Sequence, residues 1–110
     1  MSNNLKQWIE SQAGGEQIVG VVIGEMGWGD YGSVGVPDYQ SIPKGKLLSW
    51  DEAKEYLDYD FDSGYGAPGC QAVYAWTVNK VIAIGQYDGA TWPYSIPRNP
   101  VDVMPKMEGG

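Results

Sequence analysis

The sequence predicts a single α+β domain, residues 1–110, in which an antiparallel sheet of about four strands packs with two short helices. Three observations predict this class. The chain has 110 residues, the common size of one domain, and 43% of them are hydrophobic, which is enough for one core. Two segments carry apolar residues at helical spacing. Strand-forming runs separated by short turns dominate the second half, where they predict a three-stranded meander.

The first helix is expected to begin near Leu5. Leu5, Trp8 and Ile9 have the i, i+3, i+4 spacing of one apolar helix face. A polar residue at positions 2–4 can cap the start of the helix, and two glycines at positions 14 and 15 stop it. We therefore expect one short amphipathic helix at the start of the chain.

A buried strand is expected over residues 17–25, followed by a long loop over residues 26–45. β-Branched residues dominate the first segment, and such a run favours a buried strand. Residues 26–45 contain repeated glycines together with Pro37 and Pro43, which interrupt regular elements. Loops of this length in compact domains are usually functional or mobile, so this loop is the first place where a site is expected.

A second helix is expected after Ser49, preceded by a short strand at residues 46–48. Ser49 and Glu52 form a capping-box pattern, in which the hydroxyl accepts from the amide of Glu52 and the carboxylate reaches back. Apolar residues then keep helical spacing up to Leu57. Residues 57–62 alternate apolar and acidic side chains, which predicts an extended segment with its aromatic residues on one side and its carboxylates on the other.

The clearest sheet is expected in the second half of the chain. Residues 71–78 and 81–87 predict two strands, and Asp88-Gly89 predicts a two-residue turn into a third strand over residues 90–96. Pro93 has no amide hydrogen to donate, so the third strand is placed at a sheet edge. Further prolines prevent regular structure after it, and residues 98–110 are expected to form an extended or mobile tail.

Charge and composition exclude several function classes. The formal net charge is −7, from fourteen carboxylates and seven Lys and Arg residues. Such a charge is repelled by phosphate backbones and anionic lipid surfaces, so neither direct nucleic-acid binding nor membrane association is expected. Nothing in the sequence approaches the apolar length that spans a bilayer. Cys70 is the single cysteine, which leaves no intrachain disulfide and fits a cytoplasmic location.

The inventory of catalytic side chains is small. The chain has no histidine, which excludes Ser-His and Cys-His nucleophile pairs and the usual zinc sites. Cys70 precedes an apolar strand without a neighbouring cation, so a buried thiol is expected rather than a nucleophile. The sequence therefore favours a non-enzymatic protein without a cofactor. A carboxylate pair such as Asp30 and Asp88, if it converged in the fold, would support a hydrolase as a weaker alternative.

Two segments have the spacing of known ligand loops without their context. Residues 27–32 match G-x-G-x-x-G, but the glycine and proline that follow prevent the helix that would face a pyrophosphate. Asp58, Asp60 and Asp62 have the spacing that opens a calcium loop, but the glycine and the glutamate required at later positions are missing. No metal ligand set is predicted, and a looser divalent site on these aspartates stays open.

Most of the excess negative charge lies within twelve residues. Six carboxylates between Asp51 and Asp62 oppose one cation, Lys54, and aromatic residues are interleaved with them. Apolar anchors among carboxylates suit a basic surface on another protein. A solvated helix and strand with core aromatics is the structural alternative. The residues expected to bind a partner are Asp51, Glu55, Asp58, Tyr59, Asp60, Asp62 and Tyr65.

An alternative interpretation places a small-molecule site between the glycine-rich loop and the aromatic residues of the meander. A nucleotide or a sugar could stack on tryptophan and tyrosine rings there, although tryptophans in a small domain also serve as core and edge packing. The residues of this alternative ligand site are Trp28, Asp30, Tyr31, Trp92 and Arg98.

Residues 75–100 resemble a segment that recurs in small acidic proteins of phages and mobile elements. The resemblance is carried by residues 87–91 (YDGAT) and 96–100 (IPRNP), and it covers about a quarter of the chain. It brings no catalytic residue with it. What it implies is a context, because such proteins often bind and block a host protein, including bacterial defence nucleases. The leading hypothesis is a non-enzymatic acidic binding protein, a phage-type inhibitor; the alternative is a small-molecule binder.

Overall fold

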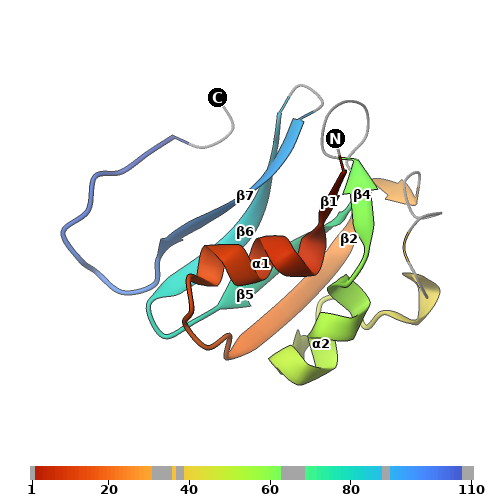
Figure 1. Ribbon diagram of the computed structural model, residues 1–110, viewed down its shortest axis with the longest axis horizontal. Coiled ribbons are helices and arrows are strands. Elements are labelled where there is room, and N and C mark those ends of the chain that lie inside the picture. Colours follow the sequence, from red (N-terminus) through yellow and green to blue (C-terminus); the bar gives the residue numbers. More distant parts are fainter. Residues whose placement is uncertain (1, 31–35, 37–38, 63–68, 88–89, 108–110) are drawn as a thin grey trace.

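The computed structural model describes residues 2–30, 36, 39–62, 69–87 and 90–107. These described residues form two α-helices and seven strands in two antiparallel sheets, so the α+β prediction is confirmed. Figure 1 shows both helices in front of the main sheet, with the carboxy-terminal segment looping away from it. The elements are β1 (Ser2–Asn4), α1 (Leu5–Ala13), β2 (Gly20–Asp30), η2 (Tyr39–Ser41), β3 (Leu47–Leu48), α2 (Trp50–Leu57), β4 (Asp60–Asp62), β5 (Gln71–Trp76), β6 (Lys80–Tyr87) and β7 (Ala90–Pro97).

The main sheet has five strands in the order β3-β2-β5-β6-β7. β5, β6 and β7 are neighbours in both sequence and space, so the predicted carboxy-terminal meander is confirmed. The short β3 pairs with β2 at the opposite edge. A second sheet joins β1 to β4, and sequence analysis had given positions 2–4 only a capping role.

Both helices cover one face of the main sheet, which we call the inner face. Apolar side chains from β2, β5 and β6 point to this face and are buried against apolar side chains of α1 and α2. Successive side chains of a strand point to opposite sides, so alternate residues are left for the other face. The buried residues at this interface include Val21, Ile23, Val73, Ala75 and Ile82 from the sheet and Leu5, Ile9, Ala53 and Leu57 from the helices.

At both ends of α1, the backbone amides and carbonyls that lack a partner within the helix form hydrogen bonds to other groups. Asn4 is the N-cap, and its Oδ1 accepts from the amide of Gln7 at 3.0 Å. Gly14 ends the helix with φ 62, a left-handed conformation that favours glycine. Lys80 of β6 donates from Nζ to the carbonyl of Gln12 at 3.0 Å. This places a cation at the negative end of the helix dipole.

The capping box of α2 is confirmed. Ser49 Oγ accepts from the amide of Glu52 at 3.2 Å, and Glu52 Oε1 accepts from the amide of Ser49 at 3.0 Å. The alternation that follows is also confirmed, because Phe61 is buried in β4 while Asp60 and Asp62 are exposed. The sequence therefore predicted which side of this segment is exposed to solvent.

The loop predicted over residues 26–45 is partly wrong, because β2 continues to Asp30. The β2–β5 register shifts between Ile23 and Met26, and such a bulge lets a glycine-rich strand bend and continue. Farther along, Tyr39 is buried, and its hydroxyl accepts from the amide of Met26 at 3.4 Å. The described end of this segment is thus packed into the core.

β7 is an edge strand, as Pro93 predicted. The amide of Arg98 donates to the carbonyl of Asn79 at 2.9 Å, and hydrogen-bonded pairs alternate along the unbroken β6–β7 register. Counting back from this pair, Pro93 and Pro97 occupy positions whose nitrogens face away from β6. Neither proline therefore interrupts the ladder between β6 and β7.

Residues 98–107, which we call the tail, form no regular element, as predicted. The first two residues of the tail, Arg98 and Asn99, form its root and are held by hydrogen bonds. Arg98 Nη1 donates to the carbonyl of Thr77 at 2.9 Å, and Asn99 Nδ2 donates to that of Val78 at 3.2 Å. Beyond the root every residue up to Met107 is exposed.

Candidate functional site

The acidic side chains of α2 and β4 form an exposed surface, which we call the acidic ridge. Its members are Asp51, Glu52, Glu55, Asp58, Asp60 and Asp62, and each of these residues is exposed. Lys54 is the one cation within this stretch, and it pairs with Asp51 at 3.2 Å. Hydrogen bonds from the backbone and side chain of Ser49 lower the pKa of Glu52. The carboxylates predicted to bind a partner thus all lie at the surface.

Asp58 and Asp60 are held side by side by a neutral group. Their Oδ1 atoms each accept from Asn4 Nδ2 at 3.0 Å, so the two oxygens are within about 6 Å of each other. The neutral Asn4 amide satisfies one hydrogen-bond acceptor on each carboxylate, but it does not neutralise the charge of either. Within the described ranges neither carboxylate takes part in an ion pair. The geometry leaves two adjacent negative charges available to a cation from outside.

The aromatic residues of the same segment point inward, which corrects the prediction for Tyr59. Tyr59 is only 5% exposed; its hydroxyl donates to Gln71 Oε1 at 3.1 Å and accepts from the Gln71 amide at 3.2 Å. Burial raises the pKa of Tyr59 far above its ordinary value. Phe61 is also buried and packs edge-on against Trp8. Trp50 and Tyr56 of α2 are half-buried and pack against the core, so the fully exposed side chains of the ridge are acidic rather than aromatic. Tyr65 lies outside the described residues.

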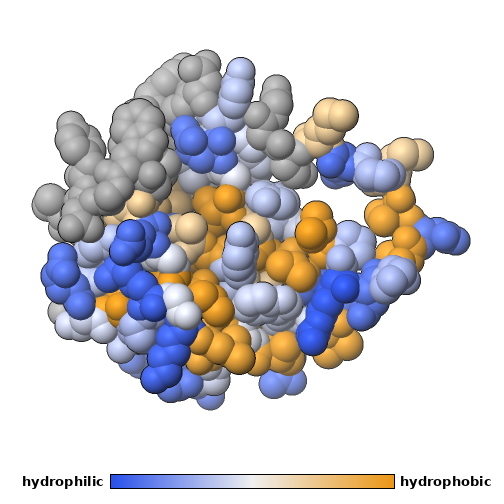
Figure 2. All heavy atoms as spheres, turned by 180° about the vertical axis from the view of Figure 1, so that it is seen from behind, coloured by the Kyte–Doolittle hydropathy of each residue, from blue (hydrophilic) through white to orange (hydrophobic). Residues whose placement is uncertain are grey.

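The outer face of the main sheet is not covered by either helix. The strand register brings alternate residues of β2, β5, β6 and β7 together there, as in the pairs Val22↔Tyr74, Trp76↔Val81 and Val81↔Ile96. Figure 2 views the molecule from this side, with apolar side chains spread across the sheet. We call this surface the open face, formed by Val22, Leu47, Tyr74, Trp76, Val81, Trp92, Tyr94 and Ile96 around the buried Ala83.

The open face is apolar and partly aromatic, and none of its eight members carries a formal charge. Leu47 is 67% exposed, Tyr74 58% and Ile96 52%. Exposed apolar patches of this kind on a folded domain commonly mark interaction surfaces. The open face is thus a second candidate surface, on the side of the sheet opposite to the helices.

Sequence analysis missed the open face, although a signal was present. A strand with one wet side alternates apolar and polar residues, whereas β5 is apolar on both sides. Val73 and Ala75 are buried, while Tyr74 and Trp76 lie on the outer side. Such a double-sided pattern predicts that both faces are covered. It does not say whether the second cover comes from the same chain.

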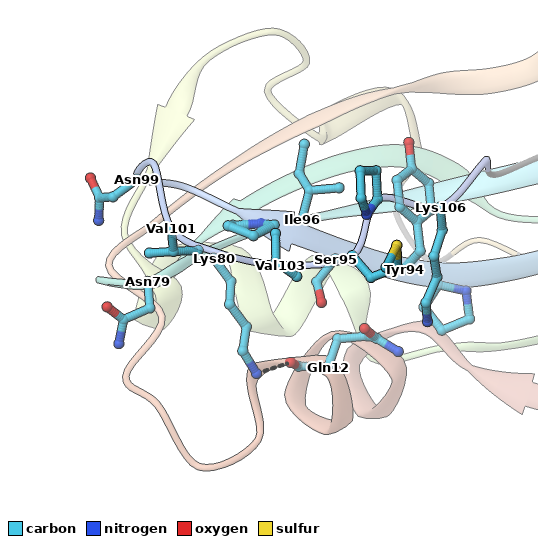
Figure 3. Close-up of a pocket in the computed structure, with 14 residues that line it drawn as sticks. Gln12, Asn79, Lys80, Tyr94, Ser95, Ile96, Asn99, Val101, Val103 and Lys106 are labelled. Carbon is cyan, nitrogen blue, oxygen red and sulfur yellow. Dashed lines mark hydrogen bonds between the residues drawn. The ribbon is translucent and has the colours of Figure 1, made fainter.

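A hollow of about 630 Å³ lies between β7 and the tail. Its lining includes Tyr94, Ser95 and Ile96 of β7 and Val101 and Val103 of the tail, which Figure 3 labels. The hollow exists because the tail leaves its root and does not pack onto its own strand.

The residues of the alternative small-molecule site do not meet in the described part of the chain. Arg98 is engaged by the carbonyl of Thr77, and Trp92 pairs with Gly85 on the open face. Neither residue lines the hollow beside β7. Trp28 and Asp30 belong to β2, but their side chains, like all of Tyr31, lie outside the described residues. The small-molecule interpretation stays a prediction.

Reactive and metal-binding groups give no further site in the part of the chain that the structure describes. Cys70 is buried, as predicted, and burial raises the pKa of its thiol to about 12, so the thiol is protonated near neutral pH. In the ranges that the structure describes, no three His, Cys, Asp or Glu side chains are grouped so that they could hold a metal ion. Among the same residues, no helix has the length and apolar composition needed to cross a bilayer.

Comparisons with family models, curated proteins and solved structures gave no match to this chain.

Proposed function

We propose that this protein is a non-enzymatic binding protein that captures a partner with a basic surface through the acidic ridge. The observation that carries the proposal is the pair Asp58 and Asp60, held together by Asn4 without a described cation beside it. An arginine or lysine from a partner would relieve the repulsion between these two carboxylates. A charge-assisted hydrogen bond to either one is stronger than the neutral bond from Asn4.

The rest of the ridge supports the same partner chemistry. Glu55 and Asp62 are exposed on the same helix–strand unit, and the net charge of −7 attracts a basic protein from a distance. Surface charges of this kind act mainly on the association rate, and salt screens them over a distance of about 8 Å at physiological ionic strength. Binding should therefore weaken steeply as salt is added.

The resemblance of residues 75–100 to small acidic phage proteins supports a host protein as the partner, with blocking of a defence protein as the biological role. The buried Cys70 thiol and the absence of histidine from the sequence support a role without catalysis.

The test is an affinity pull-down from a lysate of the source cells with immobilised protein, at low and high salt. The test variant is Asp58→Asn with Asp60→Asn, which removes two charges while each new amide oxygen can still accept from Asn4. We expect the unmodified chain to retain a captured protein at low salt and to release it at high salt. The variant should capture much less of the same protein at low salt.

The matched control is Glu10→Gln with Glu25→Gln, which changes the net charge equally at two exposed positions away from the ridge. The proposal requires that this control captures the partner as the unmodified chain does. Equal loss in both variants would assign the effect to net charge, and capture of no protein at low salt would contradict the proposal altogether.

A further inference from the structure

Two apolar surfaces are left without a covering element among the residues that the structure describes. The first is the open face of the sheet, on the side shown in Figure 2. The second is the tail, in which Val101 is 61% exposed, Val103 58%, Met104 82% and Met107 98%. Termini that carry no function are usually polar, whereas here four large apolar side chains follow one another within seven residues. Each surface therefore lacks a cover that the other is suited to provide.

The tail does not cover its own sheet, and its root explains why. Arg98 and Asn99 tie the chain to the carbonyls of Thr77 and Val78, beyond the end of β7. From there the chain swings outward and leaves the hollow of about 630 Å³ beside its own strand. Pro100 and Pro105 favour an extended backbone, so residues 100–107 project as a strip of about 26 Å.

Electrostatics select the open face as the place where two copies can meet. A chain with a charge of −7 repels a second copy wherever carboxylates would face each other. The eight members of the open face bring no carboxylate into such a contact. The acidic ridge belongs to α2 and β4, and α2 packs on the inner face, so it points away from a partner placed on the open face.

Edge-to-edge pairing through β7 is a poor alternative. The backbone nitrogens of β7 that face the open edge belong to residues 91, 93, 95 and 97, as the β6–β7 register requires. Two of them, in Pro93 and Pro97, have no hydrogen to donate. A strand added at this edge would therefore lack two of its backbone hydrogen bonds. Prolines on natural edge strands prevent edge-to-edge pairing in this way.

We propose that the open face binds a second copy of this chain, with the two faces packed together and each tail closing over the rim of the other copy. Four strands about 4.8 Å apart and about eight residues long give each open face about 500 Å². Two faces alone bury about 1,000 Å², the lower limit of specific interfaces, and two tails add about 500 Å² in total. The tails thus bring the interface to the size of a stable dimer.

This dimer adds a property to the proposed function and does not depend on it. Two acidic ridges would lie on the outer sides of one particle, so a partner that is itself dimeric or repetitive could be held at two points. Linked sites raise the overall affinity by a large factor without any new contact.

The test is the molar mass of the full chain by light scattering after size exclusion, from about 1 to about 200 µM, in about 0.15 M salt. We expect a dimer, with twice the 12.0 kDa mass of one chain. Tyr74→Glu, which places a carboxylate in the middle of the open face, should give a monomer. Gln7→Glu adds the same charge on exposed helix surface and should leave the dimer intact.

A second variant tests the tail without risk to the fold. Val103→Ser with Met104→Ser changes two exposed side chains and no charge, and should weaken dimerisation at least about tenfold. A monomer at every concentration of the unmodified chain would overturn the proposal, as would a dimer that persists in Tyr74→Glu. A dimer lost in Tyr74→Glu but unaffected by the serine variant would overturn the part assigned to the tail.

Discussion

Asn4 serves two parts of the fold with one side chain. Its Oδ1 caps α1 by accepting from the amide of Gln7, and its Nδ2 donates to both Asp58 and Asp60. The amide thus joins the start of the first helix to the acidic ridge. Aspartate would keep the cap but add a third charge, and serine would keep the cap but reach neither carboxylate.

The two roles of Asn4 can be separated by substitution. Asn4→Ala removes the cap and the bridge, and should lower the free energy of unfolding by about 1–2 kcal/mol. Asn4→Ser retains a capping oxygen and should lose about half as much. Urea denaturation followed by circular dichroism measures both values. Equal losses in the two variants would mean that the cap contributes nothing.

Two glutamates should titrate below their ordinary pKa of 4.5. The hydrogen bond from Thr77 lowers the pKa of Glu16, and hydrogen bonds from Ser49 lower the pKa of Glu52. A carboxylate whose pKa is lower in the folded state stabilises the fold above pH 4.5, and this contribution is lost as the pH falls through the folded value. Carbon-13 NMR titration should place both midpoints below 4.5. Midpoints at or above 4.5 would contradict the hydrogen bonds.

At the scale of elements, β6 and β7 depend on a close contact between Gly85 and Trp92. A Cβ atom at position 85 would lie 2.9 Å from the Trp92 ring, closer than packed atoms approach. Gly85→Ala should therefore destabilise the fold by about 1–3 kcal/mol. Adding Trp92→Leu, which removes the ring, should make the alanine nearly neutral. A double-mutant cycle in urea checks this, and additive losses would contradict it.

Most elements could be predicted from local chemistry. The capping box at Ser49, the edge position of Pro93 and the alternation around Phe61 are each set by a few neighbouring residues, and each is confirmed. The extension of β2 past Met26 was missed because glycines normally interrupt strands. Here pairing with β5 and a bulge overrule that preference. The pairing of β1 with β4 was missed because it joins segments about sixty residues apart.

The candidate site, like the fold, could be predicted from local sequence patterns only in part. The helical spacing of α2 predicts that Asp51, Glu52 and Glu55 are exposed, and the alternation after it predicts the same for Asp58, Asp60 and Asp62. The same alternation should have assigned Tyr59 to the core, since neighbouring residues of an extended segment point to opposite sides and Asp58 and Asp60 are exposed. The apolar residues on both sides of β5 indicate that both faces of the sheet are covered. Whether the chain itself covers the second face depends on where the tail goes, and no local pattern sets that.

At the scale of the whole molecule, Pro93 protects the edge of the sheet. Its nitrogen faces away from β6, so Pro93→Val should change the free energy of unfolding by less than about 0.5 kcal/mol. The valine would, however, supply a free amide to the open edge. We expect faster aggregation on incubation, measured by thioflavin fluorescence and light scattering. Pro105→Val in the tail is the control and should aggregate no faster than the unmodified chain.

The clasp that Arg98 and Asn99 form at the root of the tail also bears on kinetics. Exchange of whole strands between protein copies requires part of each fold to open first, and that opening makes such exchange slow. Here the clasp keeps β7 in its sheet, while residues 100–107 form no ladder with any strand. In the proposed dimer a tail could therefore leave one copy and join another without breaking a backbone pair of the sheet. Only its apolar side-chain contacts would have to break, so exchange of tails should be much faster than exchange of whole strands.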